Sequence, residues 1–345
     1  MTAAADADAV ERSSVVAEPV LARAGVTMPF RLVPIAGGGN NRVFQVLSAG
    51  MPVVLKSYFR HPDDPRDRLR ADFGFSSFAW LAGARALPRP LASDPDAGMA
   101  VYEFIAGRRL TPGEATAAHV AEAAAFFAAV NEHHGDPGAA ELPEASEACF
   151  SIAAHVACVD RRIERLTRID VESPLGRQAA EMVASRLRPT WSRVREAVLA
   201  ASIDVVDQPL AAVDRCLSPS DFGFHNALLA ADGRLRFLDF EYAGHDDPAK
   251  MACDFFCQPA VPVPLEHLPT FLREAFPEPA RREAVGRRAA LLQPAYQIKW
   301  CCIMLNEFLP VGDRRRAFAG AIADRGLRRN AQLAKVEAAL DHIGA

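Results

Sequence analysis

Three polar residues lie at the two ends of a segment that predicts a tight β-hairpin. Asp221 and Asn226 precede its first apolar run, and Asp239 follows its second. Asp232-Gly233 separates the two runs, and an Asp-Gly pair favours a two-residue turn because both residues tolerate positive φ. Since a hairpin returns the chain on itself, we expect Asn226 and Asp239 to lie close together, with Asp221 nearby.

Converging carboxylate and amide oxygens are typical of phosphoryl-transfer sites. A bound Mg²⁺ takes hard oxygen ligands from the protein and completes its shell with phosphate oxygens and water. A further carboxylate within reach of the substrate can accept the proton of an attacking hydroxyl. Polar residues at hairpin ends are also common turn formers, so this interpretation requires matching features elsewhere in the chain.

The spacing D-x4-N, a hairpin and then D-F-E resembles the catalytic and metal-binding segments of the aminoglycoside phosphotransferase and choline kinase-like family. The resemblance covers about residues 30–310. It implies an α+β, bilobal protein-kinase-like fold, with a small antiparallel β-sheet lobe and a larger, mainly α-helical lobe. It also implies that Asp221 is the catalytic base and that Asn226 and Asp239 hold Mg²⁺.

Such a fold needs a phosphate-binding region upstream, and residues 30–58 fit one. Apolar, β-branched runs predict three antiparallel strands at 30–36, 41–47 and 52–58. Between the first two strands lie four turn residues whose backbone can approach a phosphate, namely Gly37, Gly38, Gly39 and Asn40. Lys56 ends the third strand and matches the lysine that pairs with nucleotide phosphates in kinase-like proteins. Without the downstream motif, a solvent-facing strand residue would be the better interpretation of Lys56.

Residues 69–81 show approximately helical spacing of apolar side chains. In the family this helix supplies a glutamate that aligns the strand lysine, and the matching position here is Asp72. The shorter side chain leaves the pairing with Lys56 open, and the alternative is an exposed helix charge. The strand-like run 99–105 then corresponds to the hinge, where the backbone of Glu103, Phe104 and Ile105 would hydrogen-bond the adenine of ATP.

The remaining chain is predominantly helical. We predict helices at about 13–25, 116–134, 147–168 and 174–201, with frayed residues at 1–12. The predicted organisation is an N-terminal extension (1–29), a nucleotide-binding lobe (30–106) and a catalytic, substrate-binding helical lobe (107–345).

Candidate acceptor-binding residues are less specific. The helix predicted within 291–310 carries Trp300 and Glu307, which would suit a polyhydroxylated acceptor, although a helix of this composition is also typical of a core. His225, next to Asn226, is assigned to the substrate side of the site, with a role as base as the alternative. Glu241, two residues beyond Asp239, is also assigned to the substrate side, with the second side of the metal as the alternative. Residues 251–345 contain thirteen Lys and Arg against ten Asp and Glu, which argues against a polycationic acceptor.

Length and composition exclude other classes of protein. The 345-residue chain has a net charge of −4, which gives no indication of nucleic-acid binding. No long uncharged apolar run predicts a transmembrane helix, and the N-terminus lacks the features of a signal peptide. The seven cysteines contain no C-x-x-C pair and predict neither a zinc site nor a disulfide framework. We therefore expect a cytoplasmic protein with a small-molecule partner; the sequence leaves its oligomeric state open.

The sequence thus predicts an ATP- and Mg²⁺-dependent phosphotransferase that phosphorylates a hydroxyl of a sugar, amino alcohol or related metabolite. The alternative is a nucleotide-binding pseudokinase with a regulatory or scaffold role. Two departures from the family keep that alternative open. Asp72 replaces the usual glutamate, and Pro219 occupies the position where relatives more often carry a histidine that supports the catalytic loop.

Overall fold

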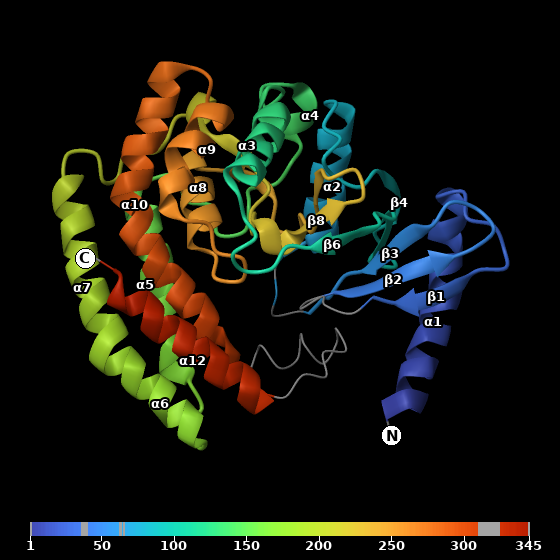
Figure 1. Cartoon of the computed structure of the whole chain (residues 1–345), viewed down its shortest axis with the longest axis horizontal. Helices are drawn as coiled ribbons and strands as arrows, with labels where there is room; N and C mark the ends of the chain where they lie inside the picture. The colour runs from blue at the N-terminus through green and yellow to red at the C-terminus, as the bar shows by residue number, and fades with distance from the viewer. Residues whose placement is uncertain (1, 36–40, 62–63, 65, 310–324, 344–345) are drawn as a thin grey trace.

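The computed structural model describes residues 2–35, 41–61, 64, 66–309 and 325–343. Figure 1 shows a small antiparallel sheet with helix α1 (Thr2–Arg23) at one end of the molecule and a larger helical body at the other. The α+β, bilobal fold expected from the sequence is confirmed. Within the described residues, no helix is both long and apolar enough to cross a membrane.

The small lobe is built on a five-stranded sheet with the order β1-β2-β3-β5-β4, in which every neighbouring pair is antiparallel. Its strands are β1 (Arg31–Pro34), β2 (Arg42–Leu47), β3 (Val53–Ser57), β4 (Pro90–Asp94) and β5 (Met99–Glu103). The three strands predicted between residues 30 and 58 are confirmed, each slightly shorter than expected. Their β-branched and aromatic side chains suit a pleated, half-buried surface.

Helix α1 packs against this sheet. Ala17, Val20 and Leu21 are fully buried in the same apolar cluster as the strand side chains. The backbone is helical from Thr2, so the prediction that residues 1–12 are frayed is wrong. The segment is rich in alanine, the residue with the highest helix propensity, which accounts for the longer helix.

Helix α2 (Arg68–Leu81) confirms the helix predicted over 69–81. It begins after the N-cap Asp67, whose side chain accepts a hydrogen bond from the backbone N–H of Arg70 at 3.0 Å. Asp72 lies on the buried face of α2 and is only 3% exposed. An exposed helix charge is therefore excluded for Asp72.

The predicted hairpin is also confirmed. Strands β8 (Ala227–Ala230) and β9 (Leu235–Phe237) pair antiparallel, and Gly233 adopts a φ of +76° in the turn between them. Strand β6 (Gly107–Arg109), which follows the hinge, adds to the other edge of β8. The first residues after the small lobe are thereby attached to the hairpin that carries the candidate site.

Helices form most of the rest of the large lobe (Figure 1), which also contains a two-stranded sheet of β7 (Cys216–Ser218) and β10 (Gly244–Asp246). The helices are α3 (Ala117–Asn131), α4 (Pro137–Ala140), α5 (Ile152–Arg165), α6 (Pro174–Met182), α7 (Arg188–Ala201), α8 (Pro248–Cys257), α9 (Leu268–Ala275), α10 (Pro279–Leu305) and α12 (Arg325–Asp341). The helices predicted at 116–134 and 147–168 correspond to α3 and α5. The one predicted at 174–201 is divided into α6 and α7 by a π-helical segment, Val183–Leu187. The domain boundaries near residues 30 and 106 stay predictions.

Candidate active site

The segment between β7 (Cys216–Ser218) and β8 forms the candidate catalytic loop. Phe222 and Phe224 anchor it, because both rings are buried and their centroids lie 5.3 and 5.4 Å from that of Phe255 on α8. Asp221, just before this anchor, has a φ of +33°, a value that non-glycine residues rarely adopt. Its side chain keeps 35% of its surface exposed. Backbone strain of this kind clusters at functional sites, where the surrounding packing enforces it.

Two neighbours in the same loop hold the Asp221 carboxylate. Asn226 Nδ2 lies 3.3 Å from one carboxylate oxygen and 3.1 Å from the Asp221 carbonyl, and His225 Nε2 lies 3.3 Å from the other carboxylate oxygen. Burial raises the pKa of Asp221, but the hydrogen bond and charge of His225 and the hydrogen bond from Asn226 outweigh it. The pKa of Asp221 therefore lies below its ordinary value. Asp221 is accordingly an anion at neutral pH.

Asp239 lies directly beyond β9, and the hairpin brings it to the catalytic loop as expected. The backbone N–H of Leu238 donates to the carbonyl of Asn226 at 2.8 Å, which connects the two ends of the hairpin. Asp239 has a φ of +68° and a side chain that is 38% exposed. Since the amide nitrogen of Asn226 is engaged by Asp221, its amide oxygen is the side-chain atom with which Asn226 could bind a metal.

Lys56 joins the two lobes at this point. Its Nζ lies 2.5 Å from Asp72 Oδ2 and 2.5 Å from Asp239 Oδ1. Burial lowers the pKa of Lys56, but the charges of Asp239 and Asp72 outweigh this effect and place the pKa well above its ordinary value. The lysine is therefore a permanent cation next to the candidate metal ligand. Its side chain is buried, so it is not a solvent-facing strand residue.

Asp72 forms the ion pair that the sequence left open. Besides Lys56, its carboxylate accepts hydrogen bonds from the Tyr58 hydroxyl at 2.8 Å and from the backbone N–H of Phe240 at 3.2 Å. The shorter side chain is thus sufficient, because α2 lies close enough to β3 for direct contact. The departure from the family at this position does not disrupt the lysine's environment.

We predict that Asp72→Ala lowers the free energy of unfolding by about 3–5 kcal/mol, the usual cost of removing one partner of a buried ion pair. The variant would leave the Lys56 ammonium and the Tyr58 hydroxyl without their shared acceptor. Urea denaturation measures the change. Asp67→Ala on the same helix is the matched control and should cost only about 1 kcal/mol, because it removes an exposed N-cap. Equal losses in the two variants would contradict the assignment.

The hinge residues differ in whether their backbone N–H groups are already hydrogen-bonded within the protein. The N–H of Glu103 donates to the carbonyl of Arg89 at 2.9 Å, and the N–H of Phe104 donates to that of Pro52 at 3.2 Å. Neither N–H is therefore free for a nucleotide. Among the described residues, none accepts a backbone hydrogen bond from Ile105, which leaves its N–H as the available donor of the three.

The candidate acceptor residues Trp300 and Glu307 each contact a charged side chain of the large lobe. Trp300 donates its indole N–H to Asp254 at 2.9 Å, beside Lys299, whose Nζ lies 2.9 and 2.8 Å from the two oxygens of Asp254. Glu307 follows α10 and pairs with Arg328 of α12 at 3.3 Å. Its carboxylate is therefore engaged by the C-terminal helix.

Glu241 is buried and contacts Asn41 and Arg68 of the small lobe. Glu241 is thus held by the small lobe rather than lying simply on the substrate side, and the sequence indicates neither of these partners. No local pattern reveals them, because Asn41 lies 200 residues away. The glycine turn, Gly37–Asn40, lies outside the described residues, so its role stays a prediction.

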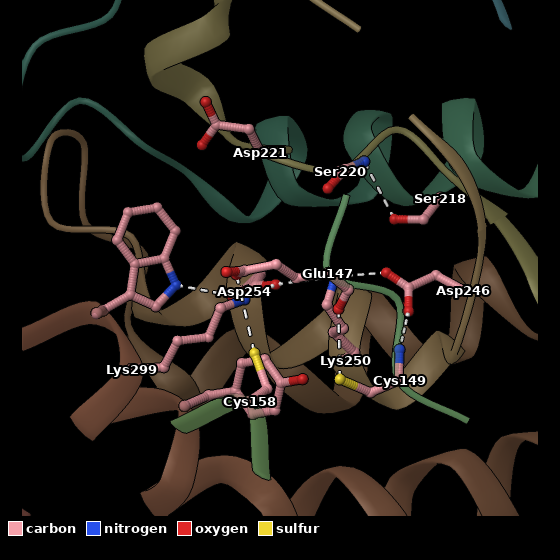
Figure 2. Close-up of polar contacts among 12 residues, drawn as sticks. Glu147, Cys149, Cys158, Ser218, Ser220, Asp221, Asp246, Lys250, Asp254 and Lys299 are labelled. Atoms are coloured by element: carbon pink, nitrogen blue, oxygen red, sulfur yellow. Dashed lines mark hydrogen bonds and ion pairs between the residues drawn. The ribbon is translucent and has the colours of Figure 1, made fainter. Parts of the chain in front are cut away.

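A buried layer of alternating charges supports the catalytic loop from below. Figure 2 shows Asp246, Lys250, Asp254 and Lys299 beneath the loop, with Asp221 directed away from them. Lys250 contacts Asp246 and lies 3.6 Å from Asp254. The side-chain partners of Asp254 in this layer are the lysines of α8 and α10, Lys250 and Lys299.

Comparison with known proteins agrees with this geometry. A family model described as "Phosphotransferase enzyme family" matches residues 31–285. No curated protein sequence gives a significant match.

Several solved structures share the fold. A choline/ethanolamine kinase family protein from Mesorhizobium loti is 20% identical, with a TM-score of 0.56 over 96% of this chain and 94% of its own. A choline kinase from Streptococcus pneumoniae is 13% identical, with a TM-score of 0.56 over 94% and 98%. A spectinomycin phosphotransferase solved with ADP and spectinomycin is 10% identical, with a TM-score of 0.57 over 93% and 98%. At these identities the likeness establishes the fold.

Proposed function

This chain belongs to the phosphotransferase enzyme family, and from that premise we propose that it transfers the γ-phosphoryl group of ATP to a hydroxyl of a small molecule. One observation carries the proposal. Lys56 of the small lobe contacts both the helix carboxylate Asp72 and the hairpin carboxylate Asp239. That arrangement joins a cation suited to phosphates to a carboxylate suited to Mg²⁺, across the line where two lobes meet.

The donor atoms fit Mg²⁺ held largely by its substrate. The Asn226 amide oxygen and an Asp239 carboxylate oxygen are hard ligands, and Mg²⁺ is usually bound by one or two protein groups together with phosphate oxygens. Among the described residues, no group of three or more His, Cys, Asp and Glu side chains is arranged to hold a metal. When bound, ATP would supply the transferable phosphoryl group, and Mg²⁺ would neutralise the negative charge of the phosphates.

The chain's own residues would then act as follows. Lys56 contacts the nucleotide phosphates, and the Ile105 N–H donates to the adenine edge. Asp221 orients the acceptor hydroxyl and accepts its proton, for which its carboxylate is already ionised. His225 holds Asp221 in place through its contact at 3.3 Å.

The charge balance near Trp300 bears on the acceptor. Both oxygens of Asp254 are bonded by Lys299, so this carboxylate is neutralised within the protein. A polycationic aminoglycoside requires several unpaired carboxylates, whereas a sugar, an amino alcohol or a related metabolite does not. We therefore propose an acceptor of the latter kind.

A pseudokinase remains the second candidate, because Pro219 stands where the family usually has a histidine. Measuring ADP release with Mg²⁺ and ATP across sugars, amino alcohols and aminoglycosides separates the two functions. We expect acceptor-dependent ADP release with a sugar or amino alcohol and none above background with aminoglycosides. ATP binding without turnover for any acceptor would favour the pseudokinase.

A further inference from the structure

Three consecutive residues of the large lobe, Asp239, Phe240 and Glu241, each contact the small lobe. Asp239 meets Lys56, and the Phe240 backbone N–H donates to Asp72. These two contacts belong to the phosphate site described above. The third, in which Asn41 Nδ2 donates to Glu241 Oε2 at 2.5 Å, has no part in that site.

Glu241 sits in a buried polar junction that we call the Glu241 junction, made of Glu241, Asn41 and Arg68. The three residues are 2%, 4% and 2% exposed, respectively. Arg68 Nε lies 3.4 Å from Glu241 Oε2, the same oxygen that Asn41 contacts. A carboxylate buried this deeply is costly unless it is paired and hydrogen-bonded, and Asn41 and Arg68 contribute to its stabilisation together with the charge of Lys56.

The two small-lobe residues of the junction are themselves fixed to one peptide segment. Asn41 Oδ1 accepts a hydrogen bond from the Phe59 N–H at 3.1 Å, and Arg68 donates to the Phe59 carbonyl at 3.3 Å. Arg68 also pairs with Asp64 at 2.7 Å. Asn41 and Arg68 are therefore not mobile surface side chains but parts of a rigid corner just beyond β3.

Two residues of the Glu241 junction also lie where secondary-structure elements begin. Asn41 immediately precedes β2 and directly follows the predicted glycine turn in the sequence. Arg68 begins α2, which carries Asp72 one turn later. Glu241 lies two residues beyond Asp239. A shift of Glu241 would therefore change the position of Asp239 relative to both the β2 strand and the Lys56–Asp72 pair.

We propose that Asn41 and Arg68 are positioning residues that hold Glu241, and through it Asp239, at a fixed place relative to the phosphate-binding strands. The junction thus determines the affinity for Mg²⁺·ATP rather than the phosphoryl-transfer step. The inference rests on the proposed function, because it presumes that Asp239 binds the metal of Mg²⁺·ATP. It also differs from a role of Glu241 as a ligand of the same metal, in that Asn41 and Arg68 of the small lobe both contact Oε2 of its carboxylate.

The test is a double-mutant cycle on the dissociation constant for Mg²⁺·ATP, measured by calorimetry on the full-length protein. Asn41→Ala removes the hydrogen bond, and Glu241→Gln keeps the size of the side chain while removing the charge that faces Arg68. We expect each single variant to weaken binding by about 5- to 20-fold and the double variant to be no weaker than the worse single, because contacting residues do not act additively. At saturating ATP, kcat should fall less than about threefold, because the junction touches no reacting group.

Trp191→Phe is the control for general destabilisation. It removes a buried indole hydrogen bond to Asp160, 2.7 Å long, in the helical body remote from the junction. This variant should lose stability and bind Mg²⁺·ATP as the wild type does. If Asn41→Ala fails to fold, Glu241→Gln carries the test against the same control.

The outcomes separate the inference from the function on which it rests. An unchanged dissociation constant for Mg²⁺·ATP in Asn41→Ala and Glu241→Gln would contradict the positioning role of the Glu241 junction. Additive effects in the double variant would contradict it as well. A wild-type protein that does not bind Mg²⁺·ATP at all would instead overturn the proposed function. If Glu241→Gln needs a higher Mg²⁺ concentration to bind ATP, while Asn41→Ala binds Mg²⁺·ATP as the wild type does, Glu241 is a metal ligand. That result would refute its positioning role.

Discussion

Asp239→Ala should abolish phosphate transfer, with kcat reduced by about a thousandfold or more, since electrostatic positioning of the phosphates supplies most of the catalysis in this chemistry. The substitution removes the proposed metal-binding carboxylate and one of the two acid partners of Lys56. Rates of ADP release at saturating ATP and Mg²⁺ measure the effect.

Asp232→Ala is the matched control for Asp239→Ala. Asp232 belongs to the same hairpin but lies at its exposed turn, where it pairs with Arg236 at 2.7 Å. An exposed pair of this kind contributes little to stability, so the control should retain wild-type kcat. An Asp239→Ala variant that keeps more than about a tenth of the activity would contradict the role of Asp239 in metal binding.

The second large effect is expected at Asp221. Asp221→Asn keeps the shape of the side chain and the contact with His225 but cannot accept a proton, so kcat should fall by about 10²- to 10⁴-fold. The dissociation constant for ATP should stay unchanged, because the contacts of Asp221 lie within the catalytic loop. Asp214→Asn, an exposed isosteric change upstream of β7, should leave both quantities unaltered.

The pH dependence of the wild type gives an independent check on Asp221. Because the folded protein holds the pKa of Asp221 below its ordinary value, the base stays ionised as the pH falls through the mildly acidic range. Loss of kcat through protonation of this group should therefore begin only below about pH 4. A kcat that halves near neutral pH would assign the base to another group.

The catalytic centre was predictable because its signals are local. Asp232-Gly233 specifies a turn, the flanking apolar runs specify two paired strands, and these together bring Asn226 to Asp239. The assignment of Lys56 combined a local signal, a β-branched run that continues to the end of a strand, with the motif near residues 221–239. For the hairpin the decisive residues are close in sequence, so that backbone preferences and periodicity determine its geometry.

Contacts between distant segments were not predictable in this way. The pairing of Asp72 with Lys56 depends on how closely α2 approaches β3. That distance cannot be inferred from helical periodicity in the sequence. Glu241 meets Asn41 from 200 positions away. The difference between Ile105, whose N–H has no backbone acceptor among the described residues, and Glu103 and Phe104, whose N–H groups donate to Arg89 and Pro52, depends on contacts between separate segments.

Errors in the prediction of helices had a different cause. The start of α1 at Thr2 reflects alanine-rich composition, which was interpreted as a frayed end. The helix expected at 174–201 is by contrast confirmed, because the backbone is helical over this whole range. Periodicity did not predict the π-helical segment Val183–Leu187 just before Pro189.

The most direct test of the proposed activity is mass spectrometry of a small-molecule extract incubated with the protein, Mg²⁺ and ATP. We predict that one hydroxyl-bearing metabolite gains a phosphoryl group with wild-type protein and that the product is absent with Asp221→Asn, although both proteins bind ATP. An extract in which the wild-type protein binds ATP but phosphorylates nothing would contradict the assignment of the chain as a small-molecule kinase.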